Sequence, residues 1–292
     1  MNGSSQFQTL RNRKGYPVGK HLQLAIPVVQ APLGSCDGPR LAGNVSRAGG
    51  LGCLSVHATP EPVLERQLTK IKQITHRPVM IALTAQWERD RILEICLEEG
   101  FRFYQTFWWN VARQAKRIHR ENGIVFSQVG SMTQAIEALD HGVDGLIAQG
   151  TEAGGQVRSP YPLRQLVTDL LVLTDNKIPI IAGGGLADAR DVAAVLSWGA
   201  SAAFLGTRFL LTEEAHAPAA HKARLRRART ENLILDPRLV GDWPCSPRRR
   251  LITAREEDTA SLFAGRGLSR INRILPVAEL LPRLFPLAYL RG

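Results

Sequence analysis

Two glycine segments contain the residues of this chain that are best suited to chemistry by type and spacing. Residues 181–185 and 205–207 each follow a short apolar run and precede a helical pattern. A glycine turn between a strand and a helix leaves backbone N–H groups unpaired at the positive end of the helix dipole, where phosphate binds. A single such loop would be a weak signal, since most glycine loops are simply tight turns. Two loops on successive strand–helix units favour the phosphate site that follows strands seven and eight of a (β/α)₈ barrel.

Strands and helices alternate along the part of the chain that carries these segments. Eight apolar runs are predicted strands, at residues 27–32, 51–57, 79–85, 101–107, 124–129, 145–149, 178–182 and 202–206. Helical patterns lie between them, for example at 61–75, 88–99, 132–140 and 188–198. Near-continuous apolar strands indicate burial on both faces, as in a parallel sheet. We therefore predict an α/β fold, a TIM (β/α)₈ barrel. An open doubly wound sheet is the alternative, which the paired glycine loops disfavour.

The predicted barrel occupies residues 1–212, and a small lid and a closing helix follow it. In the lid, residues 213–262, we predict a helix at 213–229 capped by Thr212, and then an irregular stretch that contains arginines 248–250. In residues 263–292, an apolar stretch at 268–284 is predicted to return to the barrel as its last helix. The 292 residues suffice for one barrel of about 250 residues and this appendage.

Charge limits the partners that this chain is expected to have. The formal net charge is +11, and residues 222–250 contain nine Lys or Arg but only three acidic residues. Such a stretch could attract nucleic acid, membrane phosphate or an acidic carrier protein. No groove-reading or aromatic-interleaved motif accompanies it. We therefore expect a solvated helix face with a basic loop, and neither a nucleic acid nor a membrane as partner.

The sequence shows no targeting or metal-binding pattern. No apolar run approaches the roughly 20 residues that span a bilayer, and the N-terminal residues lack the apolar core of a secretion signal. A cytoplasmic protein is therefore expected. The cysteines at 36, 53, 96 and 245 include no C-x-x-C pair, and no histidine spacing suggests a metal. We expect reduced thiols and no metal site.

Four stretches, read in order, resemble the nitronate monooxygenase family, formerly called 2-nitropropane dioxygenases. They are residues 27–33 leading to 48–52, residues 144–155, and the two glycine segments, the second in the form 204–209. A weaker likeness continues through 241–244 and 263–265. The family consists of flavin-dependent barrels, and flavin-dependent enoyl reductases of fatty-acid synthesis share much of the same framework. The resemblance covers nearly the whole chain and implies an FMN-dependent oxidoreductase.

By this resemblance, FMN would bind across the carboxyl ends of the strands, with its phosphate on the two glycine segments. The turn after strand one would run beneath the isoalloxazine ring and bond it through the backbone. Gln149 and Gly154 would flank the ring. Glycines at 154 and 155 suit this place, because only a backbone without side chains approaches a flat ring closely. The implied cofactor-binding residues are Ala31, Pro32, Leu33, Thr84, Gln128, Gln149, Gly154, Gly155, Gly183, Gly184, Gly185, Leu205, Gly206 and Thr207.

The chain departs from the family at the catalytic position. The family's catalytic histidine directly follows two glycines, whereas here Gln156 follows Gly154 and Gly155. An amide cannot take up a proton near neutral pH, although its NH₂ group can donate a hydrogen bond to an oxyanion. The asparagine that the family places near FMN on strand three is replaced by Thr84.

Three explanations of Gln156 remain open. In the first, the substrate is already anionic, as a nitronate is, and Gln156 orients its nitro oxygens. In the second, another group takes the proton, and His57 at the carboxyl end of predicted strand two is the candidate. In the third, the barrel catalyses a different flavin reaction, such as reduction of an unsaturated or oxidised-nitrogen substrate.

Three functional hypotheses follow. The first is an FMN-dependent enzyme of the nitronate monooxygenase type, which oxidises a small nitronate or related carbanion with O₂. The second is an enoyl-thioester reductase fed by NAD(P)H, in which residues 222–250 dock an acidic carrier protein or a coenzyme A phosphate. The third is a flavin-binding protein without turnover. The oligomeric state is left open, with a homodimer as one alternative.

Four further residues receive predictions. Trp108 and Trp109 follow strand four and either wall the substrate pocket or pack structurally. Glu152 is expected to satisfy backbone donors in the glycine turn. Asp144 is expected at the end of its strand that is away from the mouth, in a structural role.

Overall fold

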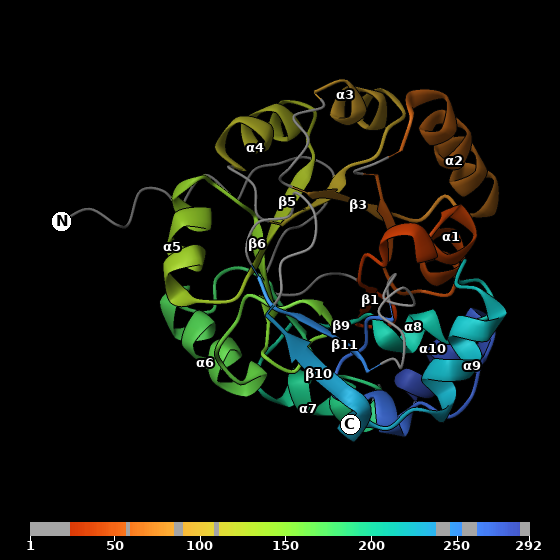
Figure 1. The fold of residues 1–292 in the computed structure, drawn as a ribbon. Coiled ribbons are helices and arrows are strands. Elements are labelled where there is room, and N and C mark those ends of the chain that lie inside the picture. Colours follow the sequence, from red (N-terminus) through yellow and green to blue (C-terminus); the bar gives the residue numbers. More distant parts are fainter. Residues whose placement is uncertain are drawn as a thin grey trace.

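A ring of parallel strands surrounded by helices forms the main body of the molecule (Figure 1). The computed structural model describes residues 24–56, 59–84, 90–107, 111–237, 246–252 and 262–286. The strands of the ring are β1 (Val28–Gln30), β2 (Gly52–Ser55), β3 (Val79–Thr84), β4 (Phe103–Phe107), β5 (Ile124–Val129), β6 (Gly145–Gln149), β8 (Ile180–Gly183) and β9 (Ala202–Leu205). Their order is β1-β9-β8-β6-β5-β4-β3-β2, and all eight predicted strands are confirmed.

The ring closes between β1 and β2. These strands meet at an isolated parallel bridge between Val29 and Leu51, where Gln30 N donates to Leu51 O at 2.9 Å. Beyond the bridge, the side chain of Gln30 continues the ladder. Its Nε2 donates to Cys53 O at 2.8 Å and its Oε1 accepts from Cys53 N at 3.1 Å. The prediction of a TIM barrel is therefore confirmed, and the open-sheet alternative is wrong.

Helices cover the outside of the ring. They are α1 (Pro39–Arg47), α2 (Glu61–Ile74), α3 (Asp90–Glu98), α4 (Val111–Arg120), α5 (Met132–Asp140), α6 (Leu163–Leu173), α7 (Ala189–Ser197) and α10 (Val277–Leu284). Each amphipathic helix buries one apolar stripe, as Leu64, Leu68 and Ile71 of α2 show. The predicted helices at 61–75, 132–140 and 188–198 agree with α2, α5 and α7 to within one residue at each end.

Side-chain alternation divides the core and creates a polar layer at the mouth. Inward side chains fill the barrel with apolar atoms, whereas their neighbours along each strand pack against the helices. Phe103, Phe126 and Ile147 are inward residues of β4, β5 and β6. Two positions further along, on the same face, these strands carry glutamines that line the mouth: Gln105, Gln128 and Gln149.

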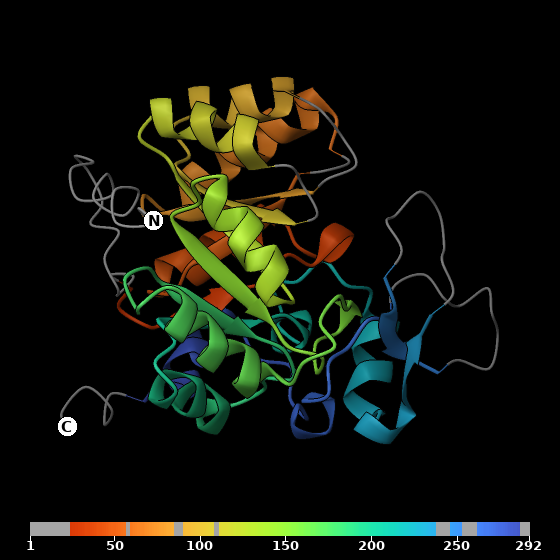
Figure 2. The same ribbon diagram turned by 90° about the vertical axis from the view of Figure 1, so that its left-hand side faces the viewer.

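A smaller antiparallel sheet lies beyond the carboxyl ends of the barrel strands (Figure 2). Its order is β10-β11-β7, with β7 at Gly155–Gln156, β10 at Leu233–Asp236 and β11 at Arg248–Leu251. The expectation of an irregular stretch is therefore wrong for the residues described there. Strand β11 pairs with β10 within the same stretch and with β7, which lies far away in the sequence and leaves no local pattern in the stretch itself.

The predicted helix at 213–229 is wrong at its start. The observed helix, α9, spans Ala219–Arg227 and has Pro218 as its N-cap, and a short helix, α8 (Thr207–Leu210), precedes it. Proline disfavours helical backbone in the residue before it, so α9 does not extend back beyond Pro218. Thr212 is buried, and its hydroxyl donates to Phe209 O at 2.7 Å rather than capping α9.

The last helix is shorter than the apolar stretch that predicts it. α10 begins at Val277 and packs against α1 and α7, while Leu268–Arg270 forms a separate 3₁₀ turn. Within the described ranges, no helix has the length and apolarity that crossing a bilayer requires.

Candidate cofactor and substrate site

A cavity of about 650 Å³ opens at the carboxyl ends of the barrel strands, a volume typical of small-molecule sites. Parallel strands bring their carboxyl ends to one edge, so loops that are far apart in sequence face the same space. The predicted site residues in its wall are Ala31, Pro32, Leu33, Thr84, Gln128, Gln149, Gly154, Gly155, Gln156, Gly183, Gly184, Gly185, Gly206 and Thr207. We call this space the cofactor cavity.

Some predicted residues do not belong to this wall. The side chain of Leu205 is 1% exposed and packs between the strands and the helices, while its carbonyl accepts from Ala31 N at 2.9 Å. His57, Trp108 and Trp109 lie outside the described residues. Among the wall residues that sequence reasoning missed are Gln105, Arg248, Phe263 and Gly265. The two-residue spacing on β4 could have identified Gln105, whereas the other three come from segments that only tertiary folding brings here.

The two glycine segments present open amides to the cofactor cavity. Within the described chain, the backbone N–H groups of Gly184, Gly185, Gly206 and Thr207 have no hydrogen-bond acceptor. Gly184 and Gly185 have φ of +136° and +71°, which side-chain-bearing residues rarely adopt. The hydroxyl of Thr207 accepts from Gly265 N at 2.9 Å, which leaves its O–H group to donate. These donors form a cradle that suits a phosphate dianion.

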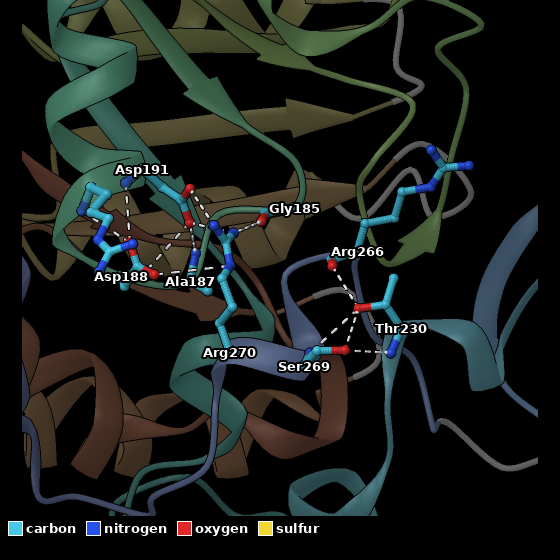
Figure 3. Close-up of polar contacts among 9 residues, drawn as sticks. Gly185, Ala187, Asp188, Asp191, Thr230, Arg266, Ser269 and Arg270 are labelled. Atoms are coloured by element: carbon cyan, nitrogen blue, oxygen red, sulfur yellow. Dashed lines mark hydrogen bonds and ion pairs between the residues drawn. The ribbon is translucent and has the colours of Figure 1, made fainter.

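Arg270 holds the first glycine segment from outside the cavity (Figure 3). Its guanidinium donates to the two carboxylate oxygens of Asp191 at 2.9 and 2.6 Å, and to Gly185 O at 3.1 Å. Asp191 also accepts from Ala187 N at 2.6 Å, just before α7 begins. A bidentate guanidinium sets both position and orientation. Arg270 therefore ties the glycine segment to the helix that follows it.

The turn after β1 is held by a buried carboxylate that sequence reasoning did not identify. Asp37 accepts from Leu33 N at 2.7 Å, from Ser55 N at 3.1 Å and from Ser55 Oγ at 2.5 Å. Ser55 Oγ in turn accepts from Gly34 N at 3.3 Å. Burial raises the pKa of Asp37 to about 6, against hydrogen bonds that lower it. This carboxylate anchors the backbone that the resemblance places beneath the flavin.

The glutamines at the mouth have different tasks. Gln105 Nε2 donates to Gln128 Oε1 at 2.6 Å, which leaves the amino group of Gln128 without an acceptor in the described chain and able to donate into the cavity. Gln149 uses both ends of its amide on the neighbouring loop. Its Nε2 donates to Gln156 O at 2.7 Å and its Oε1 accepts from Arg158 N at 3.1 Å. Gln149 therefore positions the loop that carries Gln156.

Gln156 is oriented by the small sheet. It lies opposite Arg248 in the pairing of β7 with β11, and its Oε1 accepts from Ser246 Oγ at 3.1 Å. Its Nε2 has no acceptor among the described residues, so this amino group can donate to a ligand. Among the described residues of the wall, only Cys36 and Arg248 are ionisable, and burial raises the pKa of the Cys36 thiol. This part of the wall offers no carboxylate or histidine as a base.

Two arginines of the predicted basic stretch are buried rather than solvated. The guanidinium of Arg249 donates to the carbonyls of Thr151 and Ala153, the latter at 2.8 Å, and burial lowers its pKa. Arg250 donates to Asp236 Oδ2 at 2.9 and 2.7 Å and thus joins β11 to β10. Lys222 is buried as well. The expectation of a solvated basic face is therefore wrong for these three side chains, because each finds oxygen partners inside the protein.

The segment that carries Gly265 packs directly on the glycine turn after β6. A Cβ on Gly154 would lie 2.5 Å from Gly265 N, so this packing requires a glycine at 154 independently of any bound ring. The segment is anchored through Thr230, whose hydroxyl donates to Arg266 O at 2.9 Å and whose N–H donates to Ser269 Oγ at 2.7 Å (Figure 3).

The two acidic residues that received predictions, Asp144 and Glu152, have structural roles. Asp144, at the amino end of β6, accepts from Val125 N at 2.8 Å and pairs with His119 Nε2 at 2.9 Å, in agreement with its prediction. Glu152 accepts from Leu163 N at 3.1 Å, so the donor that it satisfies belongs to the start of α6 and not to the glycine turn. No group of three or more metal-ligating side chains occurs in the described ranges.

Comparison with known proteins agrees with this geometry. A family model described as nitronate monooxygenase matches residues 17–243. A relative from Mycobacterium tuberculosis, named (3aS,4S,5R,7aS)-5-hydroxy-7a-methyl-1-oxo-octahydro-1H-indene-4-carboxyl-CoA dehydrogenase, is 31% identical over 88% of this chain and 72% of its own length. A probable nitronate monooxygenase from Bacillus subtilis is 25% identical over 91% of this chain and 96% of its own. The structure of FabK from Thermotoga maritima superposes with a TM-score of 0.81 at 23% identity, over 93% of this chain and 96% of that one, and so shares the fold.

Proposed function

The chain belongs to the nitronate monooxygenase family and is a flavin-dependent oxidoreductase. From this premise we propose that it binds FMN and oxidises a substrate that reaches the site as a carbanion, without a protein base at position 156. The observation that carries the proposal is the composition of the cofactor cavity. Its described wall joins a cradle of open amides to a glutamine whose amino group can donate, and it contains neither carboxylate nor histidine.

The fit of FMN rests on the two glycine segments. The phosphate would be held by the N–H groups of Gly184, Gly185, Gly206 and Thr207, together with the hydroxyl of Thr207. The backbone of Leu33, which Asp37 anchors, would support the ring. FMN supplies two-electron oxidation of a carbanion and delivery of those electrons to O₂, while the protein supplies orientation and electrostatics.

Gln156 acts on the charge of the substrate and not on its proton. Its amino group donates a hydrogen bond to a substrate oxygen that carries part of the negative charge, such as a nitro oxygen of a nitronate. Ser246 holds the amide oxygen, so the donor keeps its direction. Because an amide takes up no proton near neutral pH, a neutral nitroalkane has to ionise in solution before it can react.

An acyl thioester is the second candidate substrate. The relative from Mycobacterium tuberculosis is named as a carboxyl-CoA dehydrogenase, and it is 31% identical to this chain. The cofactor cavity also carries the cationic side chain of Arg248, which suits a substrate with anionic character. In this alternative, NAD(P)H or the thioester would exchange electrons with the cofactor in place of the nitronate.

The test begins with the absorption spectrum of the purified protein, which should show bound flavin. Anaerobic mixing with a nitronate should then bleach the flavin at least about tenfold faster than mixing with the parent nitroalkane, since general-base catalysis contributes about 10²–10⁴-fold where it exists. Equal rates on both forms would contradict the role given to Gln156. If NADPH bleaches the flavin rapidly and nitronates bleach it slowly, the thioester alternative holds, with the protein acting as a reductase of the thioester. A protein that is colourless and does not bind added FMN would refute the proposal.

A further inference from the structure

A second cavity, of about 1070 Å³, lies directly beside the cofactor cavity. The two spaces share Gly34, Ser35 and Ser55 in their walls, so the turn after β1 forms the boundary between them. The second cavity is enclosed by the start of α1, one face of α2 and residues 213–218. Figure 1 shows α1 and α2 side by side at this part of the ring. We call this space the outer cavity.

One wall of the outer cavity is cationic. Arg40 from α1 and Arg66 and Lys70 from α2 line it, and none of the three is in an ion pair with a carboxylate of the described chain. Arg66 and Lys70 stand four residues apart and therefore lie on the same face of α2. Like charges at this spacing repel each other and destabilise a helix, and a bound anion would relieve this repulsion.

The start of α1 adds to the positive potential of this wall. Gly38, Pro39 and Arg40 line the cavity, which places the amino end of the nine-residue helix α1 at its surface. Its N-cap, Gly38, makes no side-chain cap hydrogen bond, and the first turn contains no acidic residue. The positive end of the helix dipole therefore stays uncompensated by the helix itself.

Three acidic residues of the described chain line the outer cavity, Asp37, Glu213 and Glu214, and none of them belongs to α1 or α2. The carboxylate of Asp37 accepts from Leu33 and Ser55 in the turn. Both oxygens of Glu214 accept from Val277 N at 3.0 Å, at the start of α10. Glu213 and Glu214 come from residues 213–218 and lie within electrostatic reach of the ammonium of Lys222. The wall formed by α1 and α2 is thus left with three cations facing the cavity.

We infer that the outer cavity binds the phosphorylated ADP arm of a co-substrate whose reactive end reaches the cofactor cavity past Gly34 and Ser35. Several phosphate groups match the separate cations Arg40, Arg66 and Lys70, and apolar lining residues such as Val63 and Pro218 suit an adenine ring. Two co-substrates share this arm, with the additional phosphate on different ribose oxygens. A coenzyme A thioester carries it on the 3′ oxygen, and NADP(H) carries it on the 2′ oxygen. The inference rests on the flavin of the proposed function and on its acyl-thioester alternative, since a small nitronate that reacts with O₂ brings no such arm.

Calorimetric titration of the flavin-loaded protein tests the inference with three probes: adenosine 3′,5′-bisphosphate, adenosine 2′,5′-bisphosphate and inorganic phosphate. We expect one bisphosphate to bind at least about tenfold more tightly than inorganic phosphate, because its charges meet several donors at once. A preference for the 3′ isomer identifies a coenzyme A thioester, and a preference for the 2′ isomer identifies NADP(H). The double variant Arg66→Gln/Lys70→Gln should weaken the preferred probe by roughly tenfold or more.

The matched control is Lys116→Gln/Arg120→Gln on α4. It removes the same charge at the same four-residue spacing from exposed positions that do not line the outer cavity, and it should change the affinity by less than about twofold. Equal losses in both double variants, or bisphosphates that bind no better than inorganic phosphate, would overturn the inference. The flavin absorbance of the same samples distinguishes the two kinds of failure. A protein without flavin contradicts the proposed function, whereas a flavin-loaded protein that fails the titration contradicts only the inference.

Discussion

Gln156 determines, at the scale of a single residue, which form of a substrate the site can use. Its amide oxygen is held by Ser246 and its backbone carbonyl by Gln149, so both the side chain and the loop are fixed. A fixed NH₂ donor stabilises negative charge that is already present or that develops during the reaction. It provides no acceptor for a proton at neutral pH.

Replacing Gln156 by histidine should supply the missing base. We expect Gln156→His to raise turnover of a neutral nitroalkane by at least about tenfold, which is less than the roughly 10²–10⁴-fold that a well-positioned base contributes. Steady-state rates on the neutral nitroalkane and on its nitronate measure this, and Gln156→Leu is the control without a polar group. An unchanged rate on the neutral form in the histidine variant would show that the proton is handled elsewhere.

Thr207 offers a second prediction at the residue scale. Its hydroxyl accepts from Gly265 N and has its own proton left to donate to the phosphate of FMN. Hydrogen bonds to charged groups contribute about 1.5–3 kcal/mol, so Thr207→Ala should weaken FMN binding by roughly tenfold or more. Fluorescence titration of the flavin-free protein measures the affinity. Thr207→Ser keeps the hydroxyl and should bind nearly as well; a serine variant as weak as the alanine variant would argue against the contact.

At the scale of elements, β11 organises the glycine turn after β6. Arg249 is buried, and its guanidinium bonds the carbonyls of Thr151 and Ala153, while Arg250 pairs with Asp236 on the other side of the same strand. Arg249 and Arg250, which are neighbours on β11, thus bond two different elements, the glycine turn after β6 and strand β10. Through pairing with β7, the same strand determines where Gln156 lies.

Removing the guanidinium of Arg249 should loosen this turn. Arg249→Met leaves two buried carbonyl groups without donors. Each of them lowers the unfolding free energy by no more than about 1–3 kcal/mol. We expect a lower melting temperature and a lower kcat, since Gln156 is no longer held in register. Arg227→Met, at an exposed position of α9, is the matched control. If both variants melt together and turn over equally, the turn does not depend on Arg249.

At the scale of the whole molecule, Asp37 links global stability to pH. Its carboxylate joins the turn after β1 to the end of β2, and burial raises its pKa from 3.8 to about 6 in the folded protein. The folded protein therefore holds this proton more tightly than the unfolded chain does. The resulting stabilisation is fully present below pH 3.8 and is lost as the pH rises through 6.

The variant Asp37→Asn should remove this dependence on pH. The difference in unfolding free energy between the natural protein and the variant should change by an amount on the order of 3 kcal/mol between acid and neutral pH. Urea unfolding at a series of pH values, at one fixed FMN concentration, measures it. Curves that stay parallel over the whole range would show that Asp37 does not titrate in this window.

At this scale the molecule also places two cavities next to each other, with the turn after β1 as the boundary between them. The barrel provides the cofactor cavity at the carboxyl ends of its strands, and α1, α2 and residues 213–218 provide the outer cavity beside it. The small sheet lies beyond these strand ends (Figure 2). A long ligand that lies across the turn after β1 would thus use loops from three separate parts of the chain.

The sequence by itself determined the barrel and, through the family resemblance, about half of the residues in the wall of the cofactor cavity. Strand periodicity and glycine turns are local properties, and the barrel brings every carboxyl end to one edge, so a residue such as Gly206 or Thr84 could be placed from its position at the carboxyl end of a strand. Tertiary structure alone decided how that wall is held. The anchoring of Leu33 by Asp37, the orientation of Gln156 by Ser246 and the burial of Arg249 join distant segments. Such contacts depend on the packing free energy of the complete chain, which no local pattern encodes.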